Sequence, residues 1–135
     1  METLLQVHEN FVRNKTAEEL QYALEQHEIS LLSLETELNF YEFLLDSCKF
    51  KSPVMNLFER LMQFKKDIAT SNKKRALLLN KINVLAIKIA NAPFKKYDII
   101  IYDLEEIEVE IQDFKTDIAH LKSSLFEYLQ SVIIS

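Results

Sequence analysis

The chain has 135 residues, of which 48% are apolar and 27% are charged, and its formal net charge at pH 7 is −5. It contains no glycine, the residue on which nucleotide-binding loops and most tight turns depend. These numbers exclude Gly-rich nucleotide sites, argue against a turn-rich β fold and predict an all-α protein.

The first long helix is predicted over residues 16–50. Thr16 and Glu19 have the capping-box spacing, which marks a helix start, and residues 1–15 are expected to be a short extra helix or a frayed arm. A single bundle domain is expected over residues 16–135. The apolar positions follow alternating steps of four and three, a heptad seam. This seam comprises Leu20, Leu24, His27, Leu31, Leu34, Leu38, Tyr41, Leu45 and Cys48.

The second helix is predicted over residues 53–91. Ser52 is a favoured N-cap, and Pro53 suits the first helical position. Pro93 then ends the helix, because the residue before a proline avoids the α region. The second seam comprises Val54, Leu57, Leu61, Phe64, Ile68, Ser71, Arg75, Leu78, Ile82, Leu85 and Ile89.

The third helix is predicted over residues 95–133. Local alternation in residues 97–111 allows a strand, but the alternation stops whereas the heptad continues. Its seam comprises Leu104, Ile107, Ile111, Phe114, Ile118, Leu121, Leu125, Tyr128 and Val132. Short connections make neighbouring helices antiparallel. We therefore predict an elongated, coiled-coil-like three-helix up-down-up bundle, or a helical hairpin with a third helix packed on it.

The three segments alternate in charge. Eight acidic residues and no Lys or Arg lie between Thr16 and Cys48, residues 53–92 have a net charge of +6, and residues 95–135 have a net charge of −5. A basic helix between two acidic helices would specify partner and direction, as flanking charges do in coiled coils. The predicted intrachain charge match joins Lys65, Lys66, Lys73, Lys74 and Lys81 to Glu25, Glu28, Glu35, Glu108 and Glu110.

Turn positions predict which charges meet. They place Lys65 and Lys66 near Glu35, Glu37 and Asp117. They place Lys81 near Glu18, Glu25, Asp103, Glu105 and Glu106. They place the run Lys73–Arg75 near Glu25, Glu28, Glu108 and Glu110.

Three polar residues interrupt the seams, and the same register brings His27, Ser71 and Arg75 to one level. A buried polar layer usually fixes the alignment of helices at a cost in stability. The alternative is a ligand- or pH-responsive sensor built around this layer.

No chemical site is predicted. Asp117 and His120 only imitate the Glu-x-x-His pairs of di-iron bundles, and Cys48 on a seam is read as a small core residue. We therefore expect no enzyme activity, no catalytic or metal-binding residue, no cofactor and no small-molecule site. Nucleic acid is an unlikely partner, because two acidic helices compete for the basic residues of the middle helix. A nucleic-acid accessory protein that uses this basic helix is a further alternative function.

The setting is expected to be cytoplasmic. No run approaches the length of a membrane span, the acidic N-terminus does not fit a signal peptide, and a single cysteine allows no intrachain disulfide.

Many apolar residues lie outside the seams, and exposed apolar patches commonly mark interaction surfaces. We therefore predict a scaffold that self-associates or docks a protein partner.

The stretch ELNFYEFLLDS (37–47), followed by NLFERLMQFKKDI (56–68), resembles small uncharacterised α-helical coiled-coil proteins of Bacteroidota-type bacteria. Those proteins tend to carry a Glu-Leu-x-Phe-aromatic element on a long first helix. The resemblance implies a helical fold and a bacterial cytoplasmic setting, and it brings no activity with it.

Overall fold

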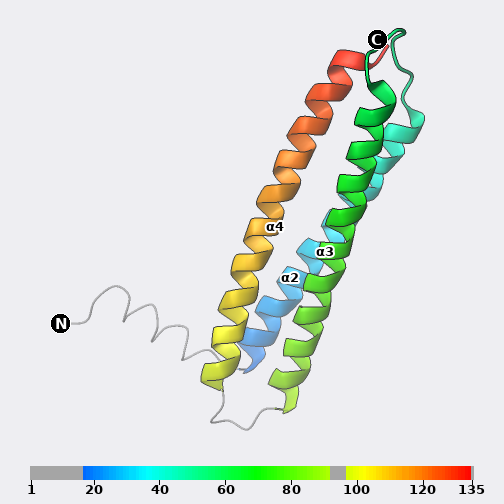
Figure 1. Ribbon diagram of the computed structural model, residues 1–135. Helices are drawn as coiled ribbons and strands as arrows, with labels where there is room; N and C mark the ends of the chain where they lie inside the picture. Colours follow the sequence, from blue (N-terminus) through cyan, green and yellow to red (C-terminus); the bar gives the residue numbers. More distant parts are fainter. Residues whose placement is uncertain (1–16, 92–96, 135) are drawn as a thin grey trace, which may run out of the picture.

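Three long helices make up the protein (Figure 1). The computed structural model describes residues 17–91 and 97–134, so the predicted N-terminal arm and the Thr16 cap lie outside the described residues. Helix α2 spans Ala17–Ser47, α3 spans Leu57–Asn91 and α4 spans Tyr97–Val132. Successive helices run in opposite directions, as Figure 1 shows, so the predicted up-down-up three-helix bundle is confirmed. At 1.5 Å per residue, the helices are about 46–54 Å long.

The heptad seams form the core. Every seam position that the structure describes is buried or half-buried, and Leu20, Leu31, Leu38 and Leu125 are fully buried. Each fully buried leucine contributes about 1.5–3 kcal/mol relative to an exposed one. The helical reading of residues 97–111 is confirmed as well, because α4 is continuous from Tyr97.

The connection between α2 and α3 differs from the prediction. Helix α3 begins at Leu57 rather than Pro53, and the Ser52–Pro53 peptide bond is cis, so the assignment of Ser52 as N-cap was wrong. Asn56 precedes the helix with φ of 58°, and its carbonyl accepts a hydrogen bond from the Arg60 amide at 3.0 Å. Asparagine tolerates this left-handed conformation better than most residues, so a helix can start here without glycine.

The connector is tied to the end of α4 by an antiparallel bridge between Phe50 and Ile133. The Lys51 amide donates to the Val132 carbonyl at 2.8 Å, and the Ile134 amide donates to the Lys49 carbonyl at 3.0 Å. These bonds satisfy backbone groups that an irregular connector would otherwise leave unpaired. They explain why the chain stays extended here instead of continuing the helix.

Helix α3 packs closely against both other helices, whereas α2 and α4 approach each other less closely. Between α2 and α4, the rings of Tyr41 and Phe126 meet edge to face, with centroids 5.7 Å apart. These two large rings fill the wider space between α2 and α4, and edge-to-face contact is a favourable arrangement for aromatic pairs. The middle helix therefore holds the bundle together.

Candidate functional site

The basic side chains of α3 are directed mainly toward α4. Three lysines on one side of α3 form ion pairs with three carboxylates of α4. The pairs, with their N–O distances, are Lys74–Asp117 at 3.8 Å, Lys81–Glu110 at 2.8 Å and Lys88–Asp103 at 3.9 Å. Both oxygens of Glu110 accept hydrogen bonds from Lys81. Among the described residues, three of the nine acidic residues of α4 thus pair with lysines of α3.

Helix α2 has eight acidic residues, and two of them form ion pairs with α3 that are found among the described residues. Only Lys65–Asp46 at 2.6 Å and Arg75–Glu35 at 3.4 Å join α3 to α2. Of the predicted charge match, four residues take part in no ion pair found among the described residues. These are Glu25, Glu28, Lys66 and Lys73.

The helices are shifted along each other by roughly two turns relative to the predicted register. Lys81 contacts Glu110 rather than Asp103 or Glu106, and Arg75 contacts Glu35 rather than Glu28. The prediction assumed that α3 starts at Pro53 directly beside the end of α2. The extended connector changes this start and accounts for the shift between α2 and α3. In both helix pairs, a shift near one heptad keeps the apolar seams facing each other.

The predicted polar layer is divided between two levels of the bundle. His27 Nε2 lies 3.3 Å from Glu108 of α4, whereas Arg75 lies opposite Glu35, about 12 Å further along α2. Ser71 lines a shallow groove between α3 and α4. The structure therefore does not bring His27, Ser71 and Arg75 together, and the sensing hypothesis loses the cluster on which it was built.

Arg75 is the one buried charged residue in the part of the chain that the structure describes, with 9% of its surface exposed. Its Nε donates to Asn72 Oδ1 at 3.1 Å. Its NH1 lies 3.4 Å from Glu35, in a geometry that is not a hydrogen bond, and has no other partner among the described residues. A guanidinium satisfied this incompletely adds little stability.

The groove beside Ser71 contains one serine, one histidine and one aspartate, the residue types of a hydrolytic triad, but not their arrangement. Asp117 and His120 line it together with Ser71. Among the described residues, no hydrogen bond joins these three side chains, and Asp117 pairs with Lys74. A nucleophile needs a base within hydrogen-bond reach, so the groove offers no catalytic arrangement.

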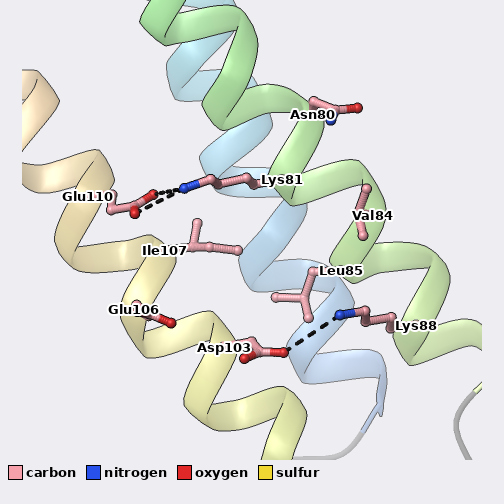
Figure 2. Close-up of a pocket in the computed structure, with 9 residues that line it drawn as sticks. All are labelled: Asn80, Lys81, Val84, Leu85, Lys88, Asp103, Glu106, Ile107 and Glu110. Atoms are coloured by element: carbon pink, nitrogen blue, oxygen red, sulfur yellow. Dashed lines mark hydrogen bonds and ion pairs between the residues drawn. The ribbon is translucent and has the colours of Figure 1, made fainter.

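A second cleft of about 320 Å³ lies between α3 and α4 near their lower ends (Figure 2). Leu85 and Ile107 lie between the two ion pairs Lys81–Glu110 and Lys88–Asp103, which cross from helix to helix. Four of the five charged residues that line the cleft are therefore paired with each other, whereas Glu106 takes part in no ion pair found among the described residues. We interpret the cleft as part of the contact between α3 and α4 rather than as a ligand pocket.

Tyr41 is the core residue with a perturbed proton affinity. Burial, followed by the charge of Glu37 and a hydrogen bond to it, raises the pKa of Tyr41 to about 12. The hydroxyl donates to Glu37 Oε2 at 3.2 Å. These effects keep the phenol neutral, so Tyr41 is a structural residue in the bundle.

The outward face of α2 carries a long line of exposed, uncharged side chains. We call it the α2 outer line; it comprises Tyr22, Gln26, Ile29, Ser33, Thr36, Phe40 and Phe43. It repeats in steps of four and three, like the core seam, but on the opposite side of the helix. Tyr22 and Phe43 are 63% and 61% exposed. The line is about 32 Å long, the length of a docking seam for another helix.

The comparable lines on the other helices are shorter or interrupted by charge. On α3, the exposed uncharged residues Leu77, Asn80, Val84, Ile87 and Asn91 span only about 21 Å, and Lys73 interrupts the line before Leu77. On α4, the exposed Tyr102 and Val109 alternate with carboxylates. An apolar surface interrupted by charge costs more to desolvate when a partner binds. The α2 outer line is therefore the best candidate surface.

Arg60 is a residue that the sequence reasoning missed. Its guanidinium lies over the rings of Phe64 and Tyr128, at 5.3 and 4.9 Å from their centroids. The spacing of Arg60 and Phe64, four residues apart on one helix, was a usable signal. Arg60 covers the upper end of the α3–α4 contact by a cation–π interaction.

The described residues contain no cluster of three potential metal ligands, and none of their helices is sufficiently long and apolar to cross a bilayer. Comparison with protein-family models, with curated proteins and with solved structures finds no match to this chain.

Proposed function

We propose that this protein is a non-enzymatic helical scaffold that binds protein through exposed apolar helix faces. The observation that carries the proposal is the α2 outer line. Its aromatic and aliphatic side chains remain exposed although the three seams already close a complete core. Exposed apolar surface is costly in water and is usually retained for an interaction.

The charge arrangement supports protein rather than nucleic acid as the partner. Lys74, Lys81 and Lys88 already pair with α4, so phosphates would have to displace these contacts. Binding of nucleic acid depends on basic side chains that can neutralise phosphates.

Sedimentation equilibrium and cross-linking test the proposal together. We expect the full chain either to self-associate at micromolar concentration or to cross-link one identified protein. The Phe40→Gln/Phe43→Gln variant should lose that association, because it removes the two rings without touching the core. A chain that stays monomeric at hundreds of micromolar and cross-links no protein contradicts the proposed function.

A further inference from the structure

The inference below rests on the proposed function and specifies the partner. We propose that the α2 outer line docks a cationic amphipathic helix of another protein, about 20 residues long. The occupant is identified by the charges that border the line and by their lack of partners within the chain.

The border of the line is acidic. Glu25 lies within four residues of both Tyr22 and Ile29, so it borders the line on the helix surface. Glu28 lies four residues before the exposed Leu32, which flanks the line. Neither glutamate takes part in an ion pair among the described residues. The described helix α2 contains no Lys or Arg at all.

The reason for this unmatched charge lies in how α3 is rotated. Three of its six lysines, Lys74, Lys81 and Lys88, contact α4. Toward α2, it places Lys65 and Arg75, together with uncharged residues such as Asn72 and Ala86 at half-buried positions. Helix α2 therefore stays acidic, because it has no Lys or Arg of its own, whereas α4 carries Lys115 and Lys122 beside its acidic residues.

A second copy fits this surface poorly. Two α2 outer lines packed together would place acidic borders against acidic borders, and like charges facing each other oppose pairing. A basic border on the incoming helix removes the repulsion and adds attraction at the rim, while its apolar residues cover Phe40 and Phe43. This is the helix-in-groove mode with charge complementarity.

The experiment uses two synthetic 21-residue helical peptides as probes. Both carry leucines at heptad a and d positions, and the flanking positions are lysine in one peptide and glutamate in the other. Binding to the full chain is measured by fluorescence anisotropy at low and high salt. We expect the lysine peptide to bind at least tenfold more tightly than the glutamate peptide, with affinity that falls as salt rises.

Two variants locate the binding surface. Phe40→Gln/Phe43→Gln should weaken the lysine peptide at least tenfold, whereas Glu25→Gln/Glu28→Gln should weaken it several-fold and reduce the salt dependence. The matched control Leu77→Gln/Val84→Gln removes similarly exposed apolar groups from α3 and should bind as the wild type does. Circular dichroism checks that each variant keeps its helix content.

The inference is overturned if both peptides bind equally, if neither binds, or if the Phe40/Phe43 variant binds as well as the wild type. Self-association that depends on Phe40 and Phe43 also overturns it, because a second copy would then be the occupant. That last result would leave the proposed scaffold function standing, so the two failures are distinguishable.

Discussion

Arg75 occupies a core position of α3, although a hydrophobic residue there would pack more favourably. Its charge is buried, and its NH1 lacks a hydrogen bond among the described residues. Replacing a buried ion by an apolar residue of similar volume is often neutral or stabilising.

Arg75→Met should therefore leave the free energy of unfolding unchanged or raise it by up to ~2 kcal/mol. Arg75→Ala should lower it by roughly 2 kcal/mol, because the aliphatic stem of arginine also packs. Urea denaturation measures both values. A loss of ~2 kcal/mol or more in Arg75→Met would mean that the contacts to Glu35 and Asn72 contribute net stability.

The raised pKa of Tyr41 predicts how the free energy of unfolding changes at alkaline pH. Its pKa is raised to about 12 in the folded chain, against about 10 in an unfolded chain. Between these values, the native state retains a proton that the unfolded state has lost. The stabilising contribution is therefore complete below pH 10 and disappears as pH rises toward 12.

Comparison with Tyr41→Phe isolates this effect, since other groups titrate equally in both proteins. The stability advantage of the wild type over the variant should shrink by about 2 kcal/mol between pH 8 and 11.5. Paired urea titrations at the two pH values measure it. An advantage that does not change with pH would show that Tyr41 titrates normally.

At the scale of elements, the connector between α2 and α3 sets how these two helices are aligned along their axes. Helix existence and core positions followed from the heptad spacing, because that spacing depends only on which residues are apolar. Helix direction followed from the short connections. The start of α3 did not follow, because Ser52 and Pro53 also suit an extended segment. The bridge from Phe50 to Ile133 joins residues far apart in sequence, and local capping rules do not detect such pairing.

Ile134→Pro tests the connector. Proline removes the amide that donates to Lys49, so the Lys51 amide should exchange with solvent at least tenfold faster. The unfolding free energy should fall by about 1 kcal/mol. Ile134→Ala is the matched control, because it shortens an exposed side chain and keeps the amide. Equal exchange rates in the two variants would argue against the bridge.

The register of α3 against α4 is tested by a double-mutant cycle between Lys81 and Glu110. Reversing either charge alone should cost stability, and reversing both should restore it, with a coupling of roughly 0.5 kcal/mol for an exposed pair. The same cycle between Lys81 and Glu106 should show a smaller coupling. A larger coupling to Glu106 would support the register predicted from the sequence.

At the scale of the whole molecule, the alternation of charge predicted that the basic helix lies between the two acidic ones. It did not predict which basic side chain pairs with which acidic helix. Net charge per segment does not say toward which neighbour a side chain points. On α3, Lys74, Lys81 and Lys88 recur every seven residues, which places them on one side of the helix. Their common direction toward α4 depends on the rotation of α3, which the apolar core sets.

The candidate surface could be predicted only in part. The surplus of apolar residues was visible in the sequence, whereas their collection into one uncharged line on α2 required knowing which face of that helix the core uses. Phe40 and Phe43 were recognisable from the sequence as large apolar residues outside the heptad seam. Gln26, Ser33 and Thr36 are polar members of the line, and because they carry no charge the line stays uncharged along its whole length.

The central claim is that α2 presents the docking surface of this protein. Backbone amide chemical shifts, recorded while the lysine peptide is titrated into the isotope-labelled chain, test it most directly. The account predicts shift changes concentrated on α2 between Tyr22 and Phe43, with the cleft between Lys81 and Glu110 unaffected. Changes concentrated in that cleft, or spread evenly over all three helices, would contradict it.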